Sequence, residues 1–235
     1  MAKKRVLIAS ILLNIVLIGF FIGKEIFAIN ACKKIEHPPL PTINHHLMRI
    51  ELFQKMPIKQ NNIVFLGNSL TQYFELAEFF QNVNIKNRGI AGDVTSGVLK
   101  RLNEITQNKP SKIFIEIGIN DILSGLSTDS IYSNYSKIID SIRIQSPETV
   151  LYIQSLLPTS KSINNNDSKA LPHIIDLNTR LSSLCRTKKI IYIDLYSHFL
   201  VNNEINAALF SKDQLHLNSD GYILWKNLIN EYVKN

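Results

Sequence analysis

Short apolar runs alternate with longer amphipathic stretches from residue 62 to the end of the chain. The apolar runs predict strands, and they lie at 63–67, 83–87, 112–117, 149–155 and 190–195. The amphipathic stretches predict helices, and they lie at 75–81, 94–107, 129–145, 176–187 and 219–233. This alternation is typical of one parallel sheet with helices on both faces. We therefore expect residues 62–235 to form one three-layer α/β/α domain with five parallel strands and right-handed crossovers.

The beginning of the chain has a different pattern. Residues 6–23 are almost entirely apolar and follow a basic cluster of Lys3, Lys4 and Arg5. A helix over this stretch is about 27 Å long, close to the roughly 30 Å of a bilayer core. The basic flank predicts a cytoplasmic N-terminus and an exported remainder.

Residues 1–29 are consequently interpreted as a membrane anchor or a signal segment. The apolar stretch is longer than is usual for a signal peptide, and Lys24 and Glu25 follow it. The candidate cleavage sites before Asn30 and Cys32 lack the small-x-small pattern. An uncleaved single-pass anchor is therefore preferred to secretion after cleavage, and both place the domain outside the cytoplasm.

Residues 30–61 are interpreted as a linker. Pro38, Pro39 and Pro41 make part of it stiff and extended, and residues 47–55 predict one helix that docks on the domain. Adjacent residues of a helix point apart, so His45 and His46 are expected to be surface residues rather than ligands.

Composition limits the classes of function. The chain has 235 residues, of which 45% are hydrophobic and 19% charged, as in a globular protein with a sizeable core. The net charge of +7 comes with no basic stripe interleaved with aromatic residues, so nucleic-acid binding is not predicted. Cys32 and Cys185 are interpreted as unpaired thiols with Cys185 buried, although a pair joining linker to core is an alternative. No cluster has metal-ligand spacing.

The first predicted strand ends in a glycine and immediately presents a serine. Residues 63–71 read Ile-Val-Phe-Leu-Gly-Asn-Ser-Leu-Thr, which places Ser69 between a buried strand and a helix. Ligands of open α/β sheets bind at the carboxyl ends of the strands, and a sharp strand-to-helix turn can hold a serine hydroxyl exposed. The alternative is that Ser69 only caps the following helix.

Asp213 and His216 lie together in a turn-rich segment near the C-terminus. A serine hydroxyl needs a base within hydrogen-bond reach, and the base needs a third group that orients it. The chain order Ser, Asp, His is the one used on α/β sheets. Ser69, Asp213 and His216 are therefore candidate catalytic residues, the alternative being that the last two only precede the final helix.

Two further strand ends carry candidate oxyanion donors. The second strand is followed by Asn-Arg-Gly-Ile-Ala-Gly-Asp at 87–93, where the glycines allow the backbone to turn and present an N–H group. The third strand is followed by Gly-Ile-Asn-Asp at 118–121, which offers the Asn120 carboxamide. Each motif alone is ordinary turn chemistry, but the three strand ends and the Asp/His loop together indicate a serine esterase.

These four motifs, at 67–70, 89–93, 118–121 and 213–216, resemble in order the blocks of the SGNH/GDSL hydrolase family. The resemblance implies a flavodoxin-like fold, Ser69 as nucleophile, His216 as general base and acid, and Asp213 as its orienting carboxylate. It also implies an oxyanion hole made of the N–H groups of Ser69 and Gly92 and the side chain of Asn120. Neither a metal nor an organic cofactor is implied.

One position departs from the family pattern. Asn68 stands where the family usually has Asp, and its side-chain acceptor is expected to brace the turn all the same. Arg88 and Asp121 are also expected to brace their loops rather than to take part in the chemistry.

The motif at 87–93 is similar to the branch that contains platelet-activating-factor acetylhydrolase-like and carbohydrate O-acetyl esterases. We therefore expect hydrolysis of short-chain acyl esters, acetyl esters on carbohydrates or glycans above all. An O-acetyltransferase acting on cell-wall glycans and a lysophospholipase or lipid acylhydrolase are the alternatives. A non-catalytic sugar-binding domain is disfavoured because Ser69, Asp213 and His216 are all present.

Overall fold

The structure is a computed structural model in which Lys24, residues 44–165 and residues 169–234 are described. The predicted membrane segment at 6–23 and Cys32 lie outside these residues. Within the described part of the chain, no helix combines the length and the apolar character needed to span a membrane.

A five-stranded sheet forms the centre of the domain, as predicted. It consists of β1 (Ile63–Gly67), β2 (Ile85–Gly89), β3 (Lys112–Glu116), β4 (Val150–Gln154) and β5 (Ile191–Ile193). The strand order is β2-β1-β3-β4-β5, and all four pairings are parallel. Gly67 at the end of β1 lies opposite both Gly89 and Glu116, so the carboxyl ends of the three strands lie level.

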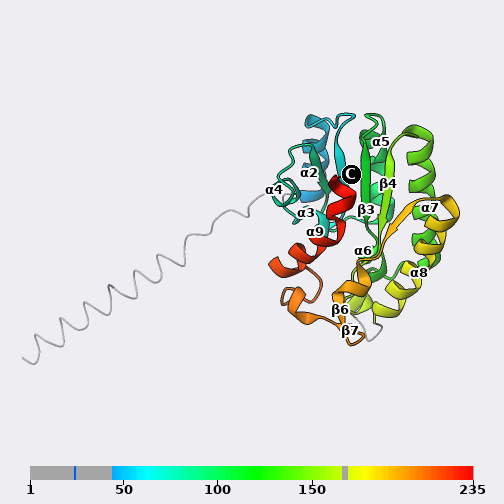
Figure 1. The fold of residues 1–235 in the computed structure, drawn as a ribbon. Coiled ribbons are helices and arrows are strands. Elements are labelled where there is room, and N and C mark those ends of the chain that lie inside the picture. The colour runs from blue at the N-terminus through cyan, green and yellow to red at the C-terminus, as the bar shows by residue number, and fades with distance from the viewer. Residues whose placement is uncertain (1–23, 25–43, 166–168, 235) are drawn as a thin grey trace, which may run out of the picture. The chain divides into compact units, whose positions relative to one another are not determined.

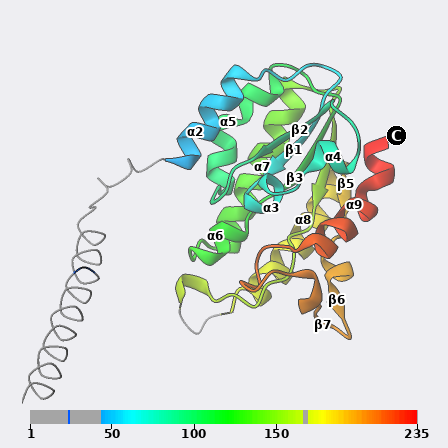
Figure 2. The same ribbon diagram turned by 90° about the vertical axis from the view of Figure 1, so that its left-hand side faces the viewer.

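Helices cover both faces of the sheet. One face packs against α5 (Thr95–Thr106), α7 (Thr128–Gln145) and α8 (Leu171–Lys188), and the other against α3 (Ser69–Gln72), α4 (Leu76–Phe79) and α9 (Ser219–Lys234). Figure 1 shows α9 crossing in front of the strands, and Figure 2 shows α5 and α7 on the opposite side of the sheet from α4 and α9. The predicted three-layer α/β/α architecture is confirmed.

The two cores follow from the alternation of side chains along the strands. Val64 and Leu66 face the α5, α7 and α8 layer, whereas Phe65 faces α9. On the α9 side, Phe65 and Tyr152 stack on either side of Phe114, with ring centroids 4.5 and 4.3 Å apart. Because β1, β3 and β4 are buried on both faces along most of their length, they read in the sequence as apolar runs.

Smaller elements complete the strand-end side of the domain. They are α6 (Ile119–Leu123), the antiparallel pair β6 (Leu200–Val201) and β7 (Glu204–Ile205), and three short 3₁₀ helices, η1 (Ile163–Asn165), η2 (Tyr196–Phe199) and η3 (Ala207–Leu209). The sequence pattern predicted none of these elements, because each is too short to show a period.

Several predicted boundaries differ from the structure. The second strand begins at Ile85 rather than 83, because a turn held by Asn82 Oδ1 accepting from the Asn84 N–H leaves Val83 exposed. The helix predicted at 75–81 forms only over Leu76–Phe79 as α4, and the preceding α3 was not predicted. Helix α8 starts at Leu171, with a proline in its first turn. Cys185 of α8 is buried as predicted, and burial raises the pKa of its thiol to about 12.

The helix predicted in the linker forms as α2 (His45–Lys55) and docks on the domain. Phe53 on its inner face is 2% exposed and lies beneath the Arg88 guanidinium, 4.6 Å from the ring centroid. Arg88 Nη2 also donates to the Met56 carbonyl at 2.5 Å, so Arg88 braces α2 against β2. His45 is exposed and His46 is partly exposed, in keeping with their prediction as surface residues, but the His46 ring also contacts Asp93, which the sequence did not predict.

Candidate active site

Ser69 lies in the turn that joins β1 to α3. Asn68 is the residue that caps this helix, since its Oδ1 accepts from the Leu70 N–H at 2.8 Å. The expected bracing role of Asn68 is therefore seen, and the alternative in which Ser69 acts as the cap is wrong. The Ser69 hydroxyl remains available for a partner from another part of the chain.

That partner is His216. Its Nε2 lies 2.9 Å from Ser69 Oγ across 147 residues of sequence, and its Nδ1 lies 2.5 Å from Asp213 Oδ2. The structure thus brings together the three residues that the sequence singled out, in one hydrogen-bonded series. The half-exposed Tyr73 flanks the site with its ring centroid 5.5 Å from that of His216.

The Asp213 carboxylate is held by its own turn. Its Oδ1 accepts from Ser211 Oγ at 2.6 Å and from the N–H groups of Leu215 and His216, both at 3.0 Å. Partial burial raises its pKa, but the hydrogen bonds from Ser211, His216 and Leu215 lower it more, and the net pKa is far below the usual range. Asp213 is therefore ionised at neutral pH.

Gly92 lies in the loop after β2 with φ +78, a conformation that favours glycine. Two hydrogen bonds fix this loop. The Ile90 N–H donates to the carbonyl of Gly67, the last residue of β1, at 3.0 Å, and the Ala91 N–H donates to Gln72 Oε1 of α3 at 2.9 Å. The N–H groups of Gly92 and Ser69 have no acceptor among the described residues. Both are free to receive an acceptor from outside the chain.

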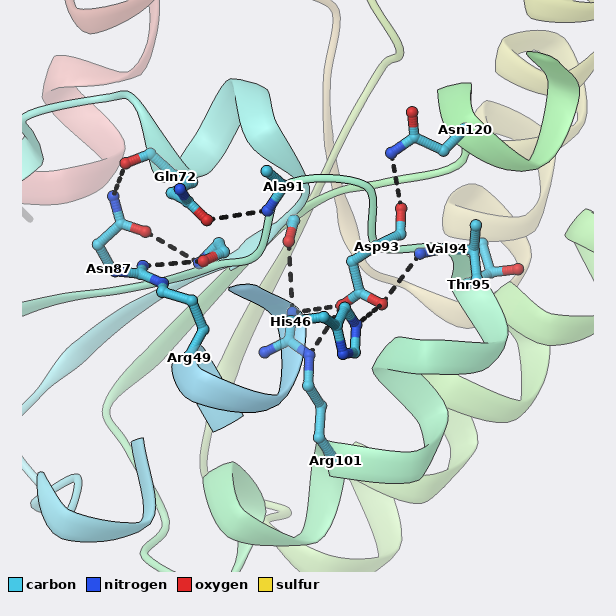
Figure 3. Close-up of polar contacts among 12 residues, drawn as sticks. His46, Arg49, Gln72, Asn87, Ala91, Asp93, Val94, Thr95, Arg101 and Asn120 are labelled. Atoms are coloured by element: carbon cyan, nitrogen blue, oxygen red, sulfur yellow. Dashed lines mark hydrogen bonds and ion pairs between the residues drawn. The ribbon is translucent and has the colours of Figure 1, made fainter. Parts of the chain in front are cut away.

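Asn120 lies in α6, after β3, and its Nδ2 donates to the Asp93 carbonyl at 2.9 Å (Figure 3). One of its two N–H bonds is used in this way, which leaves the other for a ligand. The next residue, Asp121, accepts from the Thr95 N–H at 3.0 Å and from Thr95 Oγ1 at 2.6 Å. Asp121 thus braces α6 against the start of α5, as expected.

Two polar features of this region were not predicted from the sequence. Asp93 is 1% exposed and is bonded by Arg101 and His46. Glu116 at the end of β3 is wholly buried, and neither of its carboxyl oxygens has a partner among the described residues. A glutamate inside an apolar strand run was a signal that could have drawn attention to Glu116. Among the residues that the structure describes, no group of His, Cys, Asp and Glu side chains could hold a metal ion.

A parallel α/β/α sandwich that presents a Ser–His–Asp series at its strand ends defines a hydrolase of the SGNH type. The chain belongs to the GDSL-like lipase/acylhydrolase family, whose model matches residues 65–224. Membership classes it as an ester hydrolase. The resemblance found in its four sequence motifs is thereby confirmed.

Three individual relatives each share less than 30% of their residues with this chain. N-acylneuraminate cytidylyltransferase of Escherichia coli O18:K1:H7 is 27% identical over 178 residues, which cover 74% of this chain and 41% of that protein. Platelet-activating factor acetylhydrolase IB subunit alpha2 of Homo sapiens is 26% identical over 170 residues, 70% of this chain and 72% of that protein. A GDSL-like lipase structure from Bacteroides thetaiotaomicron, 22% identical, matches 80% of this chain and 97% of its own with a TM-score of 0.71. The chain thus spans less than half of the E. coli relative, and the solved structure shares its fold.

Glu116 gives a prediction for the pH dependence of stability. Burial raises its pKa from 4.5 to about 8, so between these values the unfolded chain releases a proton that the folded chain keeps. Stability then falls as pH rises through this window and levels off above about pH 8. Glu116→Gln removes the titration, and from pH 5 to pH 8 the variant should gain on the order of a few kcal/mol relative to wild type.

The measurement is urea unfolding of both proteins at several pH values. Glu148→Gln is the matched control, because Glu148 is exposed and the same substitution there should produce no such trend. A difference between Glu116→Gln and wild type that stays constant with pH would contradict the burial argument.

Proposed function

We propose that this chain hydrolyses short-chain acyl esters, acetyl esters of carbohydrates in particular, with Ser69 as the nucleophile. The observation that carries the proposal is the series from Ser69 Oγ to His216 Nε2 at 2.9 Å and from His216 Nδ1 to Asp213 Oδ2 at 2.5 Å. A serine hydroxyl is a weak nucleophile at neutral pH, and a base oriented by a carboxylate is what activates it.

In the first half of the reaction, Ser69 Oγ attacks the ester carbonyl while His216 Nε2 takes its proton. Asp213 keeps the ring in the tautomer that accepts at Nε2 and stabilises the imidazolium that forms. His216 then gives the proton to the leaving alcohol as the bond between that oxygen and the acyl carbon breaks. In the second half, His216 takes a proton from water, which attacks the acyl group on Ser69 and releases the acid.

Negative charge develops on the carbonyl oxygen in both halves. The proposed donors are the N–H groups of Ser69 and Gly92 and the second Nδ2–H of Asn120. Two facts support them: the backbone donors have no acceptor among the described residues, and the loops that carry all three follow β1, β2 and β3 at one edge of the sheet. Removal of one such donor typically costs about 10²–10³ in rate.

The surface on the Asp213 side of the proposed site is polar. A hollow of about 440 Å³ beside it is lined by polar and charged residues, namely Ser160, Lys161, Ser162, Lys212, Asp213 and Gln214. A pocket for a long acyl chain would be lined mainly by apolar side chains. The name of the human relative supports an acetyl group as the acyl part.

We also propose that residues 6–23 anchor the protein in a membrane and that the domain lies outside the cytoplasm. The support is the basic cluster at Lys3, Lys4 and Arg5 followed by an apolar stretch long enough to span a bilayer. The substrates are then esters that occur at the outer side of that membrane.

The nucleophile and base can be tested together. Ser69→Ala and His216→Ala should each reduce turnover of p-nitrophenyl acetate by about a thousandfold or more, because each removes an essential partner of one proton transfer. Circular dichroism should show an unchanged fold. His198→Ala is the matched control, since His198 is exposed in η2 and should keep full activity. If His216→Ala retained more than a few per cent of turnover, the mechanism would be wrong.

The acyl group can be tested by chain length. The value of kcat/KM for p-nitrophenyl acetate should exceed that for the octanoate at least about tenfold, because the polar hollow gives a long chain no apolar surface to bury. Acetylated oligosaccharides, assayed by release of acetate, should also be substrates. Preference for the octanoate or for a lysophospholipid would instead indicate a lipid acylhydrolase.

The anchor can be tested by fractionation. In cells that produce the full chain, the protein should remain with membranes after an alkaline wash, because an apolar span of this length does not leave the bilayer. Protease added outside spheroplasts should digest the domain. Recovery of a soluble form that begins near Asn30 or Cys32 would show a cleaved signal instead, and digestion only after lysis would refute export.

A further inference from the structure

Asp93 connects two of the proposed oxyanion donors. Asp93 directly follows Gly92, so a displacement of the Asp93 backbone also displaces Gly92 and the N–H group that it carries. Its carbonyl oxygen accepts from Asn120 Nδ2 at 2.9 Å and thereby sets the direction of the carboxamide. A displacement of this single residue therefore moves both donors.

The Asp93 side chain is fixed by groups from three directions. Oδ2 accepts from Arg101 Nε of α5 at 2.8 Å, and Oδ1 accepts from its neighbour, the Val94 N–H, at 3.0 Å. Oδ1 also lies 3.2 Å from His46 Nε2 of α2. Because a carboxylate only accepts, His46 Nε2 is the donor of this bond. Figure 3 shows the His46 ring and Arg101 converging on the Asp93 carboxylate, with Asn120 above the backbone of the same residue.

Helix α2 reaches the end of β2 by a second contact. Arg49, three residues after His46, donates its Nη2–H to the Gly89 carbonyl at 2.9 Å. Gly89 directly precedes the loop at 90–93, so α2 holds the residue before this loop through Arg49 and the last residue of the loop through His46. The only polar partner of His46 among the described residues is Asp93.

We propose that α2 is a positioning element of the oxyanion hole and that His46 is its positioning residue. His46, together with Arg101, fixes the position of the Asp93 carboxylate. With Asp93 in this position, the Gly92 N–H and the Asn120 carboxamide both point at the reacting carbonyl oxygen. This inference rests on the proposed esterase function and adds to it a residue outside the family's four motifs.

The contact is suited to positioning rather than to holding the fold together. The His46 side chain is 38% exposed while that of Asp93 is fully buried, and Arg101 satisfies Asp93 without it. Loss of His46 therefore leaves the carboxylate paired but gives the loop more freedom. Small displacements of donors affect the transition state more than substrate binding.

The test uses the full chain and the hydrolysis of p-nitrophenyl acetate. His46→Ala should lower kcat about tenfold, less than the loss of a donor itself, with KM within about twofold and an unchanged thermal unfolding temperature. His46→Gln keeps an N–H donor on the side chain and should restore kcat to within about threefold of wild type. His45→Ala, one residue away and exposed, is the matched control and should behave as wild type.

A second variant disturbs Asp93 from the opposite side. Gly97 of α5 lies against the carboxylate, and a Cβ at this position would overlap Asp93 Oδ1. Gly97→Ala should therefore lower kcat with little change in KM, as His46→Ala does. If Gly97→Ala failed to fold, the His46 series would decide the question alone.

The outcomes separate this inference from the proposed function. A wild-type chain without Ser69-dependent hydrolysis would refute the esterase and the inference with it. A fully active wild type whose kcat is unchanged in His46→Ala would overturn the inference alone. An increase in KM with kcat unchanged in His46→Ala would also overturn it. So would an equal fall of kcat in His46→Gln and His46→Ala, because neither result is expected of a donor that positions the loop.

Discussion

Parallel pairing of β1 with both of its neighbours is the constraint on which the rest of this structure depends. It places Gly67, Gly89 and Glu116 at one level, so the chain leaves the sheet at one edge three times. Each exit carries a different group of the site: the hydroxyl of Ser69, the backbone at Gly92 and the carboxamide of Asn120. Parallel strands also require helical crossovers, and those crossovers supply the residues that fix each exit, such as Gln72 and Arg101.

The polar groups beneath the site differ in how their burial is compensated. Asp93 is paired with Arg101, and Asp121 is bonded to Thr95, so both carboxyl groups have donors that replace water. Glu116 has none among the described residues, and the carboxyl group remains neutral at pH 7 instead. The bonded carboxylates of Asp93 and Asp121 hold the loops in place. The neutral carboxyl group of Glu116 instead lowers the stability of the fold by an amount that depends on pH.

Much of this fold and site could be predicted from the sequence because the relevant signals are local. Strands β1, β3 and β4 are runs of mainly buried apolar residues, and Ser69, Asp213 and His216 are recognisable by residue type and chain order. The β2 boundary and the short helix α3 depend on local turns at Asn82 and Tyr73 that no period reveals. The contact of His46 with Asp93 spans 47 residues, and only the docking of α2 brings the two together.

The long separation between Ser69 and His216 has a consequence for biosynthesis. The serine turn belongs to the first strand of the sheet, but its base arrives in the last loop, held there by the Ser211 N–H bond to the His216 carbonyl at 2.7 Å and by α9. Tyr222 of α9 donates to the Leu70 carbonyl at 3.0 Å, next to the nucleophile. During synthesis, Ser69 therefore acquires its contact with His216 only after α9 has been made and has packed on the sheet.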